Sequence, residues 1–157
     1  MGKASRDKGY RSEYNLVKIL EKQGYNAVRV PLSGATTFAK GDIAVYLGMR
    51  EIKVKGFTVY TKDPLILEVK SRKKDFKRIY EAALIPGTID KYSLLTSEFY
   101  ITGSLKSMLT LLPIETDNIL DNDIVRKSII EKKKWLQGAD ILVLKRNNDP
   151  YIYIRYK

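Results

Sequence analysis

Apolar and polar residues recur with two different periods along this chain, and each period predicts one kind of element. Over residues 12–23, apolar side chains recur every three or four positions, which predicts a helix, and Gly24 provides a natural end. Short apolar runs, some of them alternating with polar residues, predict strands. These runs cover residues 25–32, 43–47, 49–55, 57–60 and 65–70.

The second half of the chain continues this mixture. Ser71 can cap a helix whose apolar stripe includes Phe76 and Tyr80, and another helix is predicted to end at Gly138. Further strands or short helices are expected over residues 97–102, 105–112, 141–145 and 151–156, the last two as a hairpin. This order predicts an α/β or α+β fold, a central mixed β-sheet flanked by helices, in a single domain of 157 residues.

Two residues in the run of residues 65–70 are unusual for a buried strand. Side chains alternate faces along a strand, so Glu68 and Lys70 point one way while Leu67 and Val69 point the other. An acid and an amine are costly to desolvate. Either the polar edge of this strand meets water, or Glu68 holds a metal ion and Lys70 steadies a water molecule beside it.

Two further acids stand at informative positions. Glu13 falls on the apolar stripe of the first helix, where it could favour the helix dipole, pair with a core arginine or serve a functional site. Asp42 stands at the entry of the strand predicted over residues 43–47. Both acids therefore join Glu68 as candidates for a shared site.

Composition narrows the chemistry. Lys and Arg total 29 against 18 Asp and Glu, and the net charge of +11 favours a polyanionic partner, nucleic acid or an acidic membrane surface, over a merely soluble basic protein. The absence of Cys and His excludes disulfides, Cys/His zinc sites, thiol nucleophiles and triads with a histidine base. An enzyme with this composition would depend on carboxylates, lysine, hydroxyls and a hard ion such as Mg²⁺.

Basic residues gather at two places that could bind phosphates. Residues 1–11 are expected to form a flexible basic arm, the alternative being a frayed terminus. A second group follows the strand that carries Glu68, where the alternative is a solvated helix face. The residues concerned are Lys8 and Arg11 in the arm, and Arg72, Lys73 and Lys74 after the strand.

Neither a secretory signal nor a transmembrane segment is evident in the sequence. Basic residues precede any apolar run, and the most apolar long stretch, residues 92–114, is broken by Glu98 and Lys106. We expect a soluble intracellular protein without membrane contact, located in the cytoplasm, or in the host cytoplasm if the source is a virus.

The three acids and the lysine suit metal-dependent hydrolysis of phosphodiesters. Asp42 and Glu68 would hold the ion, with the backbone carbonyl of Val69 as a further ligand. Lys70 would orient the attacking water or stabilise negative charge that builds on the phosphate. Glu13 could hold a second ion or a water in the same site. The surrounding basic residues would bind DNA mainly through its phosphates.

These residues also carry a family resemblance. Gly41 and Asp42, followed by Glu68, Val69 and Lys70, resemble the PD-(D/E)xK nuclease motif. A longer ordered series over residues 8–84 resembles the archaeal-type, Hjc-like Holliday junction resolvases and their viral and phage members. Its positions are Lys8, Gly9, Glu13, Val17, Leu20, Gly24, Tyr25, Val28, Arg29, Ser33, Gly34, Gly41, Asp42 and residues 68–72. Residues 134–144 resemble a tail of the phage-type members.

The resemblance implies a restriction-endonuclease-like PD-(D/E)xK core and assigns roles to several residues. The metal-binding and catalytic acids fall on Glu13, Asp42 and Glu68, the lysine on Lys70, the loop serine on Ser33, and a DNA-contacting basic residue on Arg29. The resemblance also implies a homodimer that cuts two opposed strands of a four-way DNA junction. Its cofactor would be Mg²⁺, for which Mn²⁺ could substitute.

Three departures from the family pattern stand out. Tyr14 follows the first glutamate where some relatives have an arginine, and residues 49–62 and 85–130 look like insertions. The leading hypothesis is a Mg²⁺-dependent, structure-selective endonuclease, a Holliday junction resolvase of DNA recombination and repair. The alternatives are a nuclease of the same fold that acts on linear or flap DNA, and a basic DNA-binding module that has lost catalysis.

Overall fold

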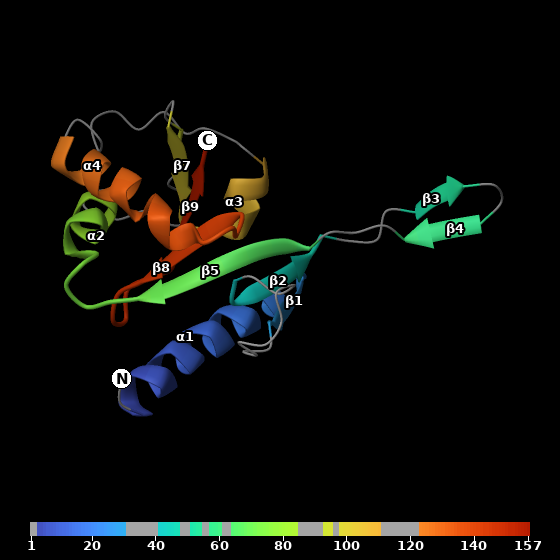
Figure 1. Cartoon of the computed structure of the whole chain (residues 1–157), viewed down its shortest axis with the longest axis horizontal. Coiled ribbons are helices and arrows are strands. Elements are labelled where there is room, and N and C mark those ends of the chain that lie inside the picture. The colour runs from blue at the N-terminus through green and yellow to red at the C-terminus, as the bar shows by residue number, and fades with distance from the viewer. Residues whose placement is uncertain are drawn as a thin grey trace.

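A seven-stranded mixed sheet forms the centre of the molecule, in the order β1-β2-β5-β8-β9-β7-β6 (Figure 1). The computed structural model describes residues 3–30, 41–47, 51–54, 57–60, 64–84, 93–95, 98–110 and 123–157. Within this sheet β5 and β8 pair in parallel, and the other neighbouring pairs are antiparallel. The strands are β1 (Asn26–Arg29), β2 (Ile43–Tyr46), β5 (Leu65–Ser71), β6 (Ser93–Leu95), β7 (Phe99–Thr102), β8 (Ile141–Lys145) and β9 (Ile152–Tyr156).

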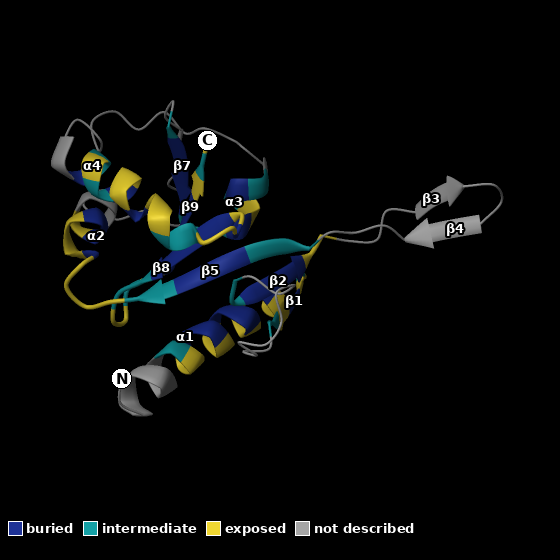
Figure 2. Ribbon diagram, viewed as in Figure 1, coloured by how far each residue is buried: buried dark blue, intermediate teal, exposed yellow. Residues whose placement is uncertain are grey.

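Helices cover both faces of this sheet, so the expected fold class, a mixed sheet flanked by helices, is confirmed (Figure 1). α1 (Lys3–Lys22) and α3 (Leu105–Thr110) pack on one face. α2 (Lys77–Leu84), α4 (Asp123–Glu131) and the 3₁₀-helix η2 (Lys132–Leu136) pack on the other. Figure 2 shows the central strands buried between these two layers.

The strands β5 and β8 divide their side chains between the two layers. Leu67 and Val69 lie beside Ile141 and Val143 in the cluster that α1 covers. The residues between them on β8 face the cluster of α2 and α4. This alternation confirms that Leu67 and Val69 anchor the strand in the core, and it places Glu68 and Lys70 on the opposite side.

The two segments that look like insertions in the sequence, residues 49–62 and 85–130, both contain β-strands. β3 (Glu51–Val54) and β4 (Phe57–Tyr60) form a separate antiparallel pair within residues 49–62. Within residues 85–130, β7 pairs with β9 in the main sheet, so that part of the segment is integral to the fold. The expected hairpin near the C-terminus is confirmed by the antiparallel pairing of β8 with β9.

Two expected boundaries are wrong. α1 begins at Lys3, so residues 3–11 are helical rather than a flexible arm. Apolar periodicity marks only the part of a helix that packs on the core. Among the α1 side chains that the structure describes, from residue 9 onward, the first fully buried apolar one is Leu16. β5 extends to Ser71, which pairs with Lys145, and α2 begins only at Lys77, so Ser71 is no helix cap. Among the described residues, none of the helices is long and apolar enough to cross a membrane.

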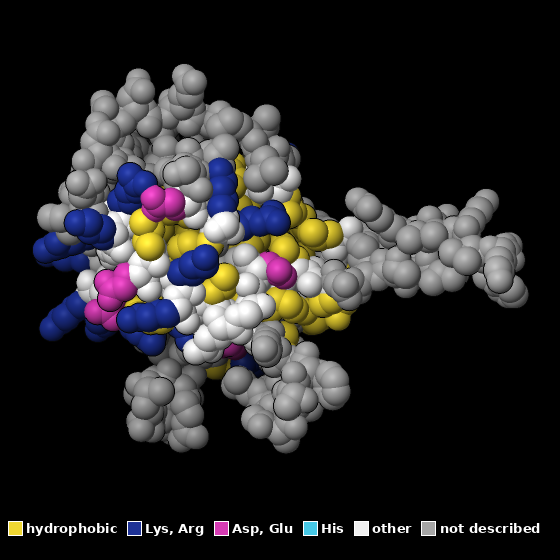
Figure 3. Space-filling view, turned by 45° about the horizontal axis from the view of Figure 1, so that its top comes forward, with side chains coloured by type: hydrophobic (Ala, Val, Ile, Leu, Met, Phe, Trp, Pro, Cys, Tyr) yellow, Lys and Arg dark blue, Asp and Glu magenta, His cyan; other side chains and the backbone are white. Residues whose placement is uncertain are grey.

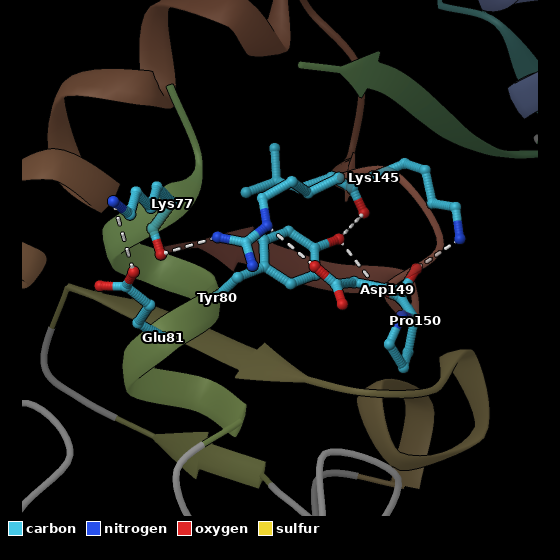
Figure 4. Close-up of polar contacts among 8 residues, drawn as sticks. Lys77, Tyr80, Glu81, Lys145, Asp149 and Pro150 are labelled. Atoms are coloured by element: carbon cyan, nitrogen blue, oxygen red, sulfur yellow. Dashed lines mark hydrogen bonds and ion pairs between the residues drawn. The ribbon is translucent and has the colours of Figure 1, made fainter. Parts of the chain in front are cut away.

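α2 holds the turn between β8 and β9 through a buried tyrosine (Figure 4). The Tyr80 hydroxyl lies 2.8 Å from the carbonyl oxygens of both Leu144 and Pro150. Arg146 in the same turn donates to the Asp149 carboxylate at 2.8 Å and to the Lys77 carbonyl at 3.3 Å. Burial raises the pKa of Tyr80 far above its usual range, so its hydroxyl remains a donor. These contacts connect α2 to the strand that pairs with β5.

We expect Tyr80→Phe to lower the free energy of unfolding by about 1–2 kcal/mol, because the two carbonyls that share its single O–H lose this donor. Urea unfolding followed by circular dichroism measures the change. Tyr46→Phe is the matched control, since Tyr46 is exposed on β2 and should change stability by less than about 0.5 kcal/mol. Equal losses for the two variants would contradict the role assigned to Tyr80.

Candidate active site

Asp42 is placed by the glycine that precedes it. Gly41 has a φ of +88°, and a Cβ there would lie 2.2 Å from Cγ2 of Ile66 and 3.2 Å from the carbonyl oxygen of Leu67. Only glycine fits this close approach to β5, and the positive φ independently favours it. Gly41 therefore lies directly against β5, and this contact places the next residue, Asp42, beside the strand that carries Glu68.

Asp42 then joins three segments. Its N–H donates to the Leu67 carbonyl at 2.9 Å, its carbonyl accepts from the Val30 N–H at 2.8 Å, and its carboxylate Oδ2 accepts from the Val69 N–H at 2.7 Å. The carboxylate thus takes the place of a strand partner where the β2–β5 pairing ends. One carboxylate oxygen, Oδ2, is used in this bond, and the carboxylate also interacts with Glu13, whose pKa it raises.

The carbonyl of Val69 lies on the same edge of β5. The N–H and C=O of one strand residue point to the same neighbour, and the Val69 N–H points to Asp42. The regular β2–β5 pairing begins at the Ile43–Leu67 pair, so the Val69 carbonyl lies beyond it. This geometry places the oxygen expected as a metal ligand beside the Asp42 carboxylate.

Glu68 is buried and pairs with Lys70. Lys70 Nζ lies 3.2 Å from Glu68 Oε1, and Glu68 is only 5% exposed. Burial raises the pKa of Glu68 to about 7, the negative charges of Asp42 and Glu13 add to this effect, and Lys70 opposes it. The predicted placement of Glu68 and Lys70 on one side of the strand is confirmed.

Glu13 is buried on α1 and bonded to Arg29. The Arg29 Nε and Nη2 donate to Glu13 Oε2 at 3.0 and 2.8 Å. Burial raises the pKa of Glu13, the bond from Arg29 opposes this, and the neighbouring charge of Asp42 adds to it. Of the explanations open for Glu13, pairing with an arginine is what the structure shows. Its proximity to Asp42 also brings it to the same site.

Contacts of Ser12, Tyr151 and Asp140 also position this site, and the sequence analysis gave these residues no functional role. The Tyr151 hydroxyl donates to the Ser12 carbonyl at 2.7 Å and fixes the turn of α1 next to Glu13. Asp140 makes two hydrogen bonds to β5 on the side away from Asp42. Its N–H donates to the Ile66 carbonyl at 2.9 Å, and its Oδ2 accepts from the Ile66 N–H at 2.8 Å. The sequence held a signal for Asp140, because an aspartate directly precedes an apolar strand there just as Asp42 precedes the strand at residues 43–47.

The three acids are close enough to perturb one another, yet each is turned toward a donor of the protein. Among the described residues, no group of three or more Asp, Glu, His or Cys side chains is arranged to hold a metal ion. Two carboxylates with one carbonyl remain, from Asp42, Glu68 and Val69. These are hard oxygen donors of the kind that Mg²⁺ prefers, and Mg²⁺ commonly needs only one or two protein carboxylates. The donor set therefore fits a single hard divalent ion.

The other predicted site residues lie around this centre. Arg72, Lys73 and Lys74 are exposed directly after β5, and Arg11 is exposed on α1. Arg72 also lies over the ring of Trp135, 5.7 Å from its centroid. Ser33 and the side chain of Lys8 lie outside the described residues. Figure 3 shows Lys and Arg side chains gathered on one side of the described surface. DNA binding by these residues stays a prediction.

Comparison with known proteins gives one match. Residues 4–84 match the family model described as archaeal Holliday junction resolvase (hjc). The matched range contains Glu13, Asp42, Glu68 and Lys70. Neither the search of curated proteins nor the search of solved structures gives a significant match.

We expect Gly41→Ala to destabilise the fold by roughly 2–4 kcal/mol, because strain at a positive φ adds to a clash with β5. Gly24→Ala is the matched control: Gly24 has a similar φ of +92° but nothing within 4 Å of an added Cβ. It should lose only about 1 kcal/mol, from strain alone. Urea unfolding of both variants measures the difference, and equal losses would show that the approach to β5 is unimportant.

We expect Glu68→Gln to stabilise the metal-free protein near pH 8 but hardly near pH 5. The pKa of Glu68 is raised from 4.5 to about 7 in the folded protein. The folded state therefore binds the proton more tightly, and this contribution to stability is complete below pH 4.5 and lost as the pH rises through about 7. A neutral glutamine avoids that loss, which is on the order of 1–2 kcal/mol after allowance for solvent screening.

Urea unfolding in EDTA at the two pH values measures this effect. Glu21→Gln, at an exposed position of α1, is the control and should show no such pH dependence. A stabilisation by Glu68→Gln that is the same at both pH values would contradict the raised pKa.

Proposed function

Because the chain belongs to the archaeal Holliday junction resolvase family, we propose that it is a Mg²⁺-dependent endonuclease that cuts opposed strands of four-way DNA junctions. The observation that carries this proposal is the edge of β5, where Asp42, Val69 and Glu68 bring hard oxygen donors together beside Lys70. The net charge of +11 supports binding to the phosphates of DNA.

Asp42 and Glu68 would hold the ion with their carboxylates, and the Val69 carbonyl would add a third oxygen. When bound, a divalent cation supplies Lewis acidity and charge neutralisation at the scissile phosphate. Asp42 can serve without losing its structural bond, since the Val69 N–H donates to one of its two carboxylate oxygens, Oδ2. Mutual repulsion among the buried acids favours uptake of a cation, because a cation relieves the same repulsion that raises the pKa of Glu68.

Lys70 would act on the reacting groups. Its ammonium lies 3.2 Å from Glu68 Oε1, and Lys70 directly follows Val69 in β5, so its side chain would reach a water or a phosphate oxygen held at this site. There it would orient the water and stabilise negative charge on the phosphate. Glu13 would accept a hydrogen bond from a water in the site, while Arg29 keeps its other oxygen fixed.

Paired cuts require two such sites. Each chain provides one edge of β5 with this arrangement among its described residues, so cutting both opposed strands would require a homodimer. Symmetry of the dimer would match the symmetry of the junction. This dimer belongs to the proposal, as does the preference for junctions over linear or flap DNA.

A basic DNA-binding module that has lost catalysis is the less favoured alternative. Pure phosphate binding would be better served without buried acids, because carboxylates repel phosphates and are costly to bury. The chain nevertheless keeps Glu13, Asp42 and Glu68 buried or partly buried near one another, with bonds that position them. A nuclease of the same fold acting on linear or flap DNA remains an alternative that the experiment below separates.

The deciding experiment compares four-way junction, linear duplex and flap DNA, each with Mg²⁺, Mn²⁺ or EDTA. We expect paired symmetric nicks in the junction with either metal and none in EDTA. Asp42→Asn and Glu68→Gln should each lose about 100-fold or more in cleavage rate, since even residues outside a metal's ligand set cost 10–100-fold. Both variants should retain binding.

Glu81→Gln is the matched control, because Glu81 is exposed on α2 and pairs only loosely with Lys77 at 3.9 Å. It should cut at the wild-type rate. Equal cutting of linear duplex would refute junction selectivity, and binding without cleavage in every metal would favour the non-catalytic module.

A further inference from the structure

Two stacked tyrosine rings with a cation at each end lie on the flank of α1, beside the site described above. The rings of Tyr10 and Tyr14 stack with their centroids 6.1 Å apart and their planes 10° from parallel. The Arg29 guanidinium lies 4.1 Å from the Tyr10 centroid, and Lys18 Nζ lies 4.6 Å from the Tyr14 centroid. Residues 10, 14 and 18 are successive neighbours at four-residue spacing on one helix. We call Arg29, Tyr10, Tyr14 and Lys18 the ladder.

The ladder is exposed although its rings are large. Tyr10 is 51% exposed and Tyr14 is 43% exposed. Core packing therefore does not explain the stack, which differs in this from the buried apolar stripe of the same helix. Exposed aromatic side chains held in a fixed arrangement are typical of binding surfaces.

The arrangement favours one mode of binding. One face of each ring is covered by a cation, and the rings lie against each other. A base would have to displace a cation in order to stack, whereas the hydroxyl-bearing edges need no rearrangement. The ladder thus offers a row of O–H and N–H donors. The Tyr14 hydroxyl beside Lys18 raises the pKa of the Lys18 ammonium, which stays charged.

Phosphates are the ligand that such a row suits. Tyrosine, lysine and arginine are among the usual donors to the phosphates of DNA. The stacking and cation–ring contacts already fix the side chains, so less conformational entropy is lost on binding. The ladder has a cation at each end, so an anionic partner suits it better than the same basic surface of a second copy of this chain.

The ladder is connected to the acidic site through Arg29. The same guanidinium that lies over Tyr10 donates to Glu13 Oε2 at 2.8 Å. The row therefore starts next to the acids and runs along α1 toward Lys18. We propose that Tyr10, Tyr14 and Lys18 bind the phosphate backbone of a DNA strand that leaves the acidic site along α1. Its position on the substrate rests on the proposed function.

The test measures binding without cleavage. Fluorescence anisotropy in EDTA gives the Kd of the full-length protein for a labelled four-way junction and for linear duplex at several salt concentrations. We expect the double variant Tyr10→Phe with Tyr14→Phe to bind about 10-fold more weakly, because the rings remain but two hydroxyl donors are lost. Lys18→Gln should bind about 3-fold more weakly and lower the salt slope by about one.

Two controls match these changes. Tyr46→Phe removes an exposed hydroxyl on β2, and Lys127→Gln removes an exposed charge on α4. Each should change Kd by less than about 2-fold. Circular dichroism should show that all variants keep the fold, as expected for exposed positions.

Several results would overturn the proposal. Wild-type Kd in the double Phe variant, with weaker binding in Tyr10→Ala with Tyr14→Ala, would mean that the rings stack on bases. A changed oligomeric mass in sedimentation, with unchanged Kd, would make the ladder an interface between copies. The proposed function is tested separately by cleavage: if no DNA is cut in any metal while the ladder variants still weaken binding, only the proposed function fails.

Discussion

The hydrogen bond from the Val69 N–H to the Asp42 carboxylate is the contact on which the rest of the site depends. It exists because Gly41 has no side chain and can lie against β5, where any Cβ would meet Ile66. This approach places Asp42, the residue before β2, beside the strand that carries Glu68 and Lys70. A single backbone constraint thus brings together residues that are separated by 27 positions in the chain.

The clustered acids of this site destabilise the metal-free protein. Three acids are buried or partly buried near one another, and burial with mutual repulsion raises the pKa values of Glu13 and Glu68. Arg29 and Lys70 compensate in part. A fold selected for stability alone would gain by removing such acids. Their retention suits the cation site proposed above, in a chain that belongs to the archaeal Holliday junction resolvase family.

The helix α1 serves both the acids and the surface beside them. Its buried stripe anchors it to β5, and the Tyr151 hydroxyl fixes the turn that precedes Glu13. Its exposed flank carries the ladder, with Arg29 shared between Tyr10 and Glu13. One arginine therefore joins the surface proposed for DNA to the acidic site.

The sequence by itself determined the kinds of elements, the sides of β5 and the candidate residues. Period-two alternation placed Glu68 with Lys70 and Leu67 with Val69. The apolar stripe of the first helix singled out Glu13, and the entry of a strand singled out Asp42, because these patterns are local along the chain. The expected flexible arm was wrong, because apolar periodicity cannot report helical residues whose sequence has no apolar stripe. Three contacts became visible only in the tertiary structure: the pairing of Glu13 with Arg29, the bond from Val69 to Asp42, and the hydrogen bonds between Asp140 and Ile66. These contacts join distant segments, and their partners are chosen by how the strands and α1 pack together.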